Sequence, residues 1–252
     1  MSSTPPTTPP GSPDSSAIPA EPAPAESTPA ESEIVTPPDG DYRWEIRRGG
    51  VVMATEEVKL DGGRLTGTRR ISESGDRHEV EADLGDDRLI RRLVLHYSRG
   101  PFTRTATFES ADEFLRGSIT ALGGRDNFIV KLGRFREIDG DLVIFKSFII
   151  ARARARGQLR FTGRIASIDP ATLMATTYKQ TYRRGGDDDL RWIYEPRMGD
   201  TESIELDERG VVVRRIDARG NETILVGATT SASGRANTIL TRVGGAGNAD
   251  SD

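Results

Sequence analysis

The chain has 252 residues and a mass of 27.5 kDa, with no cysteine and two histidines. This composition excludes disulfide frameworks, iron–sulfur clusters, thiol nucleophiles and cysteine zinc sites, and it argues against a histidine-rich metal centre. The 35 Lys and Arg residues against 39 Asp and Glu residues give a net charge of −4, which argues against a protein built to neutralise nucleic-acid phosphates.

The first 40 residues differ in composition from the rest of the chain. They hold 11 of the 14 prolines and six acids but no base, and most of the others are Ser, Thr, Ala and Pro. Such a segment cannot bury enough apolar surface to offset the roughly 1–2 kcal/mol per residue that backbone ordering costs. Residues 1–40 are therefore predicted to be a disordered linker rich in Pro, Ser, Thr, Ala and Glu.

The start of the chain leaves the location open. Met1 is followed by Ser, Ser, Thr and Pro, without the basic start and apolar stretch of a secretory signal. We expect a periplasmic or cell-envelope protein if an upstream signal has been removed, and a cytoplasmic one otherwise. No apolar run reaches the ~18 residues of a membrane-spanning helix, so no transmembrane segment is expected.

From Asp41 onward, apolar and polar residues alternate. Tyr42, Trp44 and Ile46 alternate with charged residues, and residues 77–84 repeat this pattern. Alternation predicts half-buried strands, and the short Gly and Asp turns between them predict antiparallel hairpins. Residues 41–228 are therefore predicted to form one mainly β domain. We expect a large antiparallel meander that makes a half-barrel, an open barrel or a barrel-like sandwich, with one or two short helices.

Two segments are candidates for those helices. Ser110 and Glu113 have the spacing of a capping box, which favours a short helix over residues 110–115. Residues 141–156 are ambiguous, because their apolar run from Leu142 to Ile150 is too continuous for a solvated strand. Gly157, just beyond them, suits a helix end. We favour a strand that enters a helix, and the alternative of a strand throughout stays open.

The two terminal segments account for the net negative charge of the chain. Residues 229–252 are rich in Ser, Gly, Ala and Asn and are predicted to be a flexible C-terminal tail. Without the six acids of the linker and without Asp250 and Asp252, the chain carries four more bases than acids. An anionic partner is therefore less disfavoured than the overall charge indicates.

Aromatic residues of the predicted strands would face one concave side if the sheet curls. Most such residues form core, but the concave side of a half-barrel is not fully closed and can hold an apolar ligand. The predicted ligand-binding residues are Trp44, Phe161, Tyr178, Tyr182, Trp192 and Tyr194.

A cluster of arginines is the strongest charge pattern. In an extended chain these residues would share one face and could bind phosphates, sulfates or lipid head groups, whereas in a helix residues two apart diverge by about 200°. A solvated face paired with acids such as Asp187 is the favoured interpretation. The predicted anion-binding residues are Arg152, Arg154, Arg156, Arg160 and Arg164.

The two histidines lie on opposite faces of their predicted strands. His78 lies with Val80 and Ala82 and points inward, whereas His96 faces away from Leu95. An inward histidine beside a carboxylate can act as a general base, although a hydrogen-bonded core histidine is more common. The sequence contains no G-x-S-x-G, H-E-x-x-H, G-x-G-x-x-G or Walker motif, so no catalytic residue, metal site or cofactor is predicted.

Both ends of the β domain resemble a known class of domain. The segments 42–46, 49–56 and 60–63 resemble the first hairpin, and residues 204–215 the last hairpin, of bacterial envelope β-domains of unknown function. Those domains share a half-barrel shape with the LolA and LolB lipoprotein carriers, which hold acyl chains in their hollow. The resemblance implies lipid binding at the cell envelope and supplies no catalytic residue.

These observations favour a non-enzymatic module that binds a lipid or another apolar ligand in the concave face. One alternative is an acid–base enzyme that uses His78 with nearby carboxylates. Another is an interaction protein whose face from Arg152 to Arg164 binds an anionic partner. No specific nucleic acid is expected as a partner, and the sequence leaves the oligomeric state open.

Overall fold

A computed structural model describes residues 36–196, 199–232 and 235–239. These residues form one 16-stranded, mainly antiparallel sheet and one helix. The sheet is open, because β8 and β9 are its two ends and do not pair with each other. This confirms the predicted fold class of a large open meander. Within the described part of the chain, no helix is long and apolar enough to cross a membrane.

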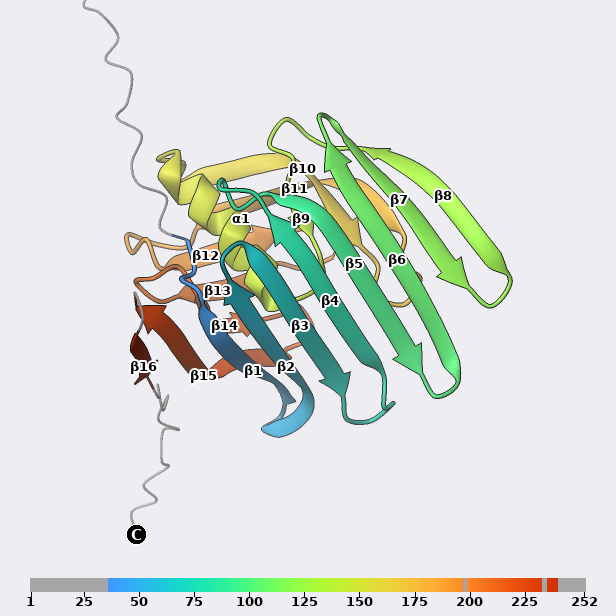
Figure 1. Ribbon diagram of the computed structural model, residues 1–252. Coiled ribbons are helices and arrows are strands. Elements are labelled where there is room, and N and C mark those ends of the chain that lie inside the picture. The colour runs from blue at the N-terminus through green and yellow to red at the C-terminus, as the bar shows by residue number, and fades with distance from the viewer. Residues whose placement is uncertain (1–35, 197–198, 233–234, 240–252) are drawn as a thin grey trace, which may run out of the picture. The chain divides into compact units, whose positions relative to one another are not determined.

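The first eight strands pair in chain order, each with the next (Figure 1). They are β1 (Gly40–Arg48), β2 (Val51–Asp61), β3 (Arg64–Ile71), β4 (Arg77–Leu84), β5 (Ile90–Arg99), β6 (Phe102–Ala111), β7 (Phe114–Ala121) and β8 (Gly124–Lys131).

The second half of the chain extends the same sheet from the other side of β1. Its elements are β9 (Ile138–Asp139), α1 (Val143–Ala155), β10 (Arg160–Ile168), β11 (Ala175–Arg184), β12 (Arg191–Glu195), β13 (Glu202–Leu206), β14 (Val212–Ile216), β15 (Glu222–Ala232) and β16 (Arg235–Ile239). Strand β15 pairs with β1, with β14 and with β16, and β9 pairs in parallel with β10.

Glycine pairs set the tightest hairpins. Gly49 and Gly50 join β1 to β2 with φ values of +54° and +81°, and Gly62 and Gly63 join β2 to β3 with +56° and +86°. A two-residue turn of this kind needs a positive φ at both positions, which glycine adopts without a Cβ clash. These turns fix the register of β1, β2 and β3, so their alternating apolar residues share one face.

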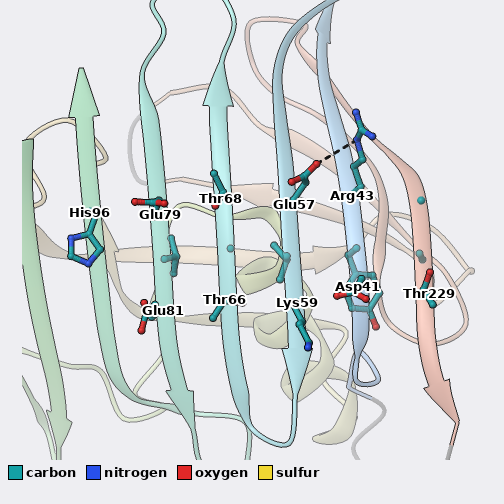
Figure 2. A pocket seen from close by; sticks show the side chains of 16 residues that line it. Asp41, Arg43, Glu57, Lys59, Thr66, Thr68, Glu79, Glu81, His96 and Thr229 are labelled. Carbon is teal, nitrogen blue, oxygen red and sulfur yellow. Dashed lines mark ion pairs between the residues drawn. The ribbon is translucent and has the colours of Figure 1, made fainter. Parts of the chain in front are cut away.

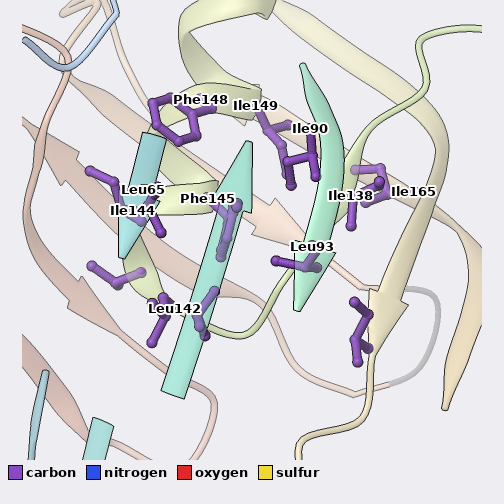
Figure 3. Packing of buried hydrophobic residues seen from close by; sticks show 14 of the residues in the cluster. Leu65, Ile90, Leu93, Ile138, Leu142, Ile144, Phe145, Phe148, Ile149 and Ile165 are labelled. Carbon is purple, nitrogen blue, oxygen red and sulfur yellow. The ribbon is translucent and has the colours of Figure 1, made fainter. Parts of the chain in front are cut away.

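The core lies between the sheet and α1. Helix residues Val143–Ala153 are all buried, and Figure 3 shows Leu142, Phe145 and Ile149 packed among Leu65, Leu93, Ile138 and other strand residues. A helix that is apolar on all sides is stable only when it is surrounded, because each fully buried aliphatic or aromatic side chain contributes about 1.5–3 kcal/mol. The side of the sheet that contacts α1 is called the inner face below.

The ambiguous segment 141–156 contains α1, and the two-residue strand β9 precedes it at Ile138–Asp139. The helix of the favoured interpretation is therefore confirmed, whereas the strand expected to enter it within residues 141–156 is not found, because β9 ends at Asp139.

The expected helix over residues 110–115 is wrong. Strand β6 continues to Ala111 and β7 begins at Phe114, with Asp112 in the turn at a φ of +52°. Phe108 and Leu115 are both fully buried by the paired strands. A helix here would remove these two side chains from the core, so strand pairing prevails over the capping-box spacing.

Strand β1 begins at Gly40, next to the predicted domain start at residue 41. At the other end, β15 continues past residue 228 to Ala232 and pairs with β16. Most of the predicted linker and the end of the predicted tail, residues 1–35 and 240–252, lie outside the described residues.

Candidate functional site

The six aromatic residues predicted to bind a ligand lie in the strands around α1, and five of them are buried, with Tyr178 half-buried. The Trp44 Nε1 donates to the Val212 carbonyl at 2.8 Å, and the Tyr194 hydroxyl donates to Gln180 Oε1 at 2.9 Å. Burial raises the pKa of both Tyr182 and Tyr194, so both hydroxyls stay protonated. The aromatics therefore form core around α1.

A row of directly paired residues crosses the inner face from β1 to β6. Side chains of directly paired residues share a face of the sheet. Most members of this row are polar or charged on a face that is otherwise apolar. Backbone pairing aligns Trp44, Glu56, Arg69, His78, Tyr97 and Arg104, which we call the inner row.

One end of the inner row holds the start of α1. The N-cap residue Leu142 has no side chain that can accept a hydrogen bond, and the Glu56 carboxylate of β2 accepts the Val143 N–H at 2.6 Å instead. Arg69 donates to Glu56 Oε2 from Nε at 3.1 Å and from Nη2 at 2.7 Å. A carboxylate at a helix N-terminus satisfies a free N–H and suits the helix dipole.

Asp141 completes this arrangement. Its Oδ1 accepts a hydrogen bond from Arg69 Nη1 at 2.8 Å, and its Oδ2 lies 3.3 Å from His78 Nδ1. The residue has a φ of +77°, a conformation that aspartate tolerates better than most residues. Burial acts to raise the pKa of Asp141, but Arg69 and His78 more than offset it and lower the pKa to about 2. Asp141 is therefore ionised at neutral pH.

Further polar contacts fix the rest of α1. Lys146 Nζ lies 2.9 Å from Asp139 Oδ2, Arg152 pairs with the buried Glu137, and the Ser147 hydroxyl accepts the Val212 N–H at 3.0 Å. Because α1 is buried and bonded to the sheet along its length, the inner face next to it is filled. A hollow opens on the inner face beyond the helix.

That hollow lies at the end of β5 and β6 where the hairpin turn joins them, and we call it the mouth. Its volume is about 840 Å³, and it is lined by Ser74, Tyr97, residues 99–104, Ala121, Leu122 and Ala171. Tyr97 pairs with Arg104, and Arg99 pairs with Phe102, so these four extend the inner face. The Arg104 Nη1 donates to the Ala171 carbonyl at 2.8 Å, which ties β6 to the turn between β10 and β11.

The mouth combines positive charge with exposed apolar side chains. Phe102 is 63% exposed and Leu122 is 78% exposed. Arg99 and Arg104 are the charged residues of the lining, and no carboxylate belongs to it among the described residues. Asp76 lies behind Arg99 at 3.5 Å and accepts a hydrogen bond from the Tyr97 hydroxyl at 3.2 Å.

A second hollow, of about 700 Å³, lies on the outer face of β1–β5 and β15. Figure 2 shows the side chains that line it, with α1 behind the sheet. Its lining includes Thr66, Thr68 and Gly227, which leave room between longer side chains. Acids and bases are mixed in it, and Arg43 lies 4.0 Å from Glu57. His96 belongs to this outer face, as its alternation predicts. The lining has no exposed apolar group that would hold an apolar ligand.

The structure does not bring the five predicted anion-binding arginines onto one face. Arg152 and Arg154 belong to α1, and Arg152 is buried against Glu137. Arg156 lies over the ring of Phe135 at 4.5 Å. Only Arg160 and Arg164 share a face, on the outer side of β10, where both are exposed.

Glu56, Arg69, Asp141 and the mouth are not among the residues predicted from the sequence. Two of them could have been identified from the sequence, because Glu56 and Arg69 are charged residues at positions of their strands that should face inward. Nothing in the local sequence indicates that these side chains meet Asp141. The mouth is formed by three separate turns and a distant carbonyl, so no short pattern predicts it.

Comparison with known proteins yields one structural likeness. No family model and no curated protein matches the chain. Among solved structures, the chain is similar to a DUF1089 family protein from Pseudomonas aeruginosa, at 23% identity and a TM-score of 0.49, over 65% of this chain and 89% of that one. The comparisons establish no link to the LolA and LolB carriers, so that resemblance stays a prediction.

Proposed function

We propose that the protein is a non-enzymatic binding module for an amphiphilic anion, such as a fatty acid or an anionic lipid, held at the mouth. The observation that carries this proposal is the lining of one hollow by Arg99 and Arg104 together with exposed Phe102 and Leu122. The ligand site proposed here lies at the open end of the concave face and not in its aromatic-lined interior, because α1 fills that interior.

Each part of such a ligand finds a matching group. A guanidinium donates two parallel hydrogen bonds to a carboxylate or phosphate, which a neutral donor cannot match in strength. Covering a large exposed apolar side chain contributes up to about 1.5–3 kcal/mol. The volume of about 840 Å³ is typical of small-molecule sites. It accommodates the head group and the first part of a chain.

Titration with a fluorescent long-chain fatty acid tests the proposal. We expect saturable binding to the wild-type protein. Arg104→Glu removes a cation and Phe102→Asp removes an apolar contact, so each should raise the dissociation constant about ten-fold or more. Lys131→Glu is the matched control, because it makes the same charge change on exposed β8, away from the mouth. Thermal unfolding of every variant checks that the fold is retained. Binding that is absent, or equal in all four proteins, would contradict the proposal.

A second candidate function is favoured by the pairing of His78 with Asp141. A carboxylate beside Nδ1 orients an imidazole so that its other nitrogen can accept a proton, as in general-base catalysis. Tyr97 packs edge-on against His78, with ring centroids 5.1 Å apart, and also lines the mouth. A base acting on a ligand in the mouth would thus need Tyr97 to move aside.

Hydrolysis of p-nitrophenyl esters of increasing chain length tests this second candidate. An acid–base enzyme predicts turnover above the buffer rate that His78→Gln abolishes while Tyr97→Ala, which opens the path from the mouth, raises it. No turnover, or equal turnover in wild type and His78→Gln, would leave the binding module as the function.

A further inference from the structure

Two basic residues stand directly opposite each other on the outer face of β10 and β11. Arg164 pairs in register with Lys179, and both side chains are exposed. Like charges in directly opposed positions destabilise a sheet. Within the described residues, neither has an acidic group within 4.0 Å, whereas most bases on this sheet have one. The fold thus retains a repulsive pair without a compensating acid.

The surroundings of this pair form a basic hollow. Arg164 and Lys179 line it together with Arg160 and the threonines Thr162, Thr177 and Thr181, and its volume is about 660 Å³. Its one acid, Glu195, is already bound, because Arg183 Nε lies 2.6 Å from Glu195 Oε1 and Arg160 Nη2 lies 3.6 Å from Oε2. The positive charge of Arg164 and Lys179 is therefore left uncompensated.

We propose that this outer hollow is a binding site for a phosphate group, held between Arg164 and Lys179. A phosphate group places negatively charged oxygens beside both cations at once, and threonine hydroxyls supply further donors. The site lies on the opposite face of the sheet from the inner row, so it is independent of the mouth. The phosphate group belongs either to a free anion or to a lipid head group, and the two share the chemistry that this site recognises.

Two probes distinguish these sources. Inorganic phosphate is titrated into the full chain by calorimetry, and the protein is sedimented with phosphatidylcholine vesicles prepared with and without phosphatidic acid. We expect Lys179→Glu to lower the affinity for the bound probe about ten-fold or more and Lys179→Arg to retain it. Lys131→Glu, with the same charge change on β8, should behave as wild type. Binding should also weaken as salt rises.

A thermal scan separates loss of the site from loss of the fold. Lys179→Glu places an acid opposite Arg164, so the variant should unfold at a higher temperature than wild type while its phosphate binding falls. Arg164→Gln provides a second test without a new charge pair. Binding of free phosphate that only the site variants lose identifies a soluble anion, and vesicle binding that only they lose identifies a lipid head group. Failure of wild type to bind either probe, or equal binding by Lys179→Glu and Lys131→Glu, overturns the proposal.

Discussion

Glu56 joins three parts of the fold through one carboxylate. It lies in β2, accepts the first N–H of α1 and pairs with Arg69 of β3, which in turn bonds to Asp141. Replacement of one partner of such a buried set leaves the others desolvated and unpaired, which costs more than the bond itself contributes. At the scale of single residues, these charges act chiefly to hold α1 in place.

Asp141 should make the stability of the protein depend on acid. Its pKa is 3.8 in the reference state and about 2 in the folded protein. Because the folded pKa is the lower one, ionised Asp141 stabilises the fold above about pH 4, and this contribution of about 2 kcal/mol is lost as the pH falls toward 2. We expect the difference in free energy of unfolding between wild type and Asp141→Asn to shrink by that amount over this range, measured by urea denaturation.

Asp112→Asn is the matched control for this prediction. Asp112 also has a positive φ, of +52°, but it is exposed in a hairpin turn. Asparagine tolerates the same backbone conformation, so neither substitution introduces strain. A constant difference between wild type and Asp141→Asn across the pH range would show that Asp141 is not held by Arg69 and His78 as described.

Only part of this residue-level arrangement could be predicted from the sequence. The alternation of β4 correctly turns His78 inward. Glu56, by contrast, meets a helix start 87 residues later in the chain. A contact over that separation depends on the complete fold, and no local spacing encodes it.

At the scale of elements, α1 shows why the segment 141–156 is ambiguous. Its apolar residues cover all sides, so it has neither the 3.6-residue stripe of a surface helix nor the alternation of a strand. The surrounding sheet decides the outcome by burying every side. The surrounding sheet also decides the outcome at residues 110–115, where strand pairing prevails over the capping-box spacing and no helix forms.

Ser147→Ala tests how α1 is tied to β14. The substitution removes only the hydroxyl oxygen, which accepts the Val212 N–H at 3.0 Å. A buried donor left without a partner costs about 1–3 kcal/mol, and we expect a loss of that size in the free energy of unfolding. Chemical denaturation measures it.

Ser118→Ala is the corresponding control, because the hydroxyl of Ser118 accepts its hydrogen bond from an exposed arginine, Arg125, and not from a buried group. Its effect should remain within about 0.5 kcal/mol. Equal effects of the two substitutions would mean that the Ser147 bond does not fix the helix.

At the scale of the whole molecule, the order of the first hairpins could be predicted, but the pairing that joins the two halves of the chain into one sheet could not. Strands β1–β8 follow the meander that alternation and glycine turns indicate. The pairing of β1 with β15 joins residues near the two ends of the described chain, and many strands of similar alternation could have taken that place. Five of the six aromatic residues predicted to line the concave side are buried, and Tyr178 is half-buried. Whether a ligand can reach these residues depends on whether α1 fills the inner face, and the sequence does not settle this.

The absence of cysteine allows a single probe to be attached at a chosen site. We would label Ser74→Cys, an exposed position in the lining of the mouth that leaves Phe102 and Arg104 intact, and, separately, Ile129→Cys on β8, where the native side chain is 65% exposed, with an environment-sensitive fluorophore. Adding oleate should shift the emission of the probe at residue 74 to shorter wavelength in a saturable way and leave the probe at residue 129 unchanged. An unchanged mouth probe, or the same response at both positions, would contradict the assignment of the mouth as the ligand site.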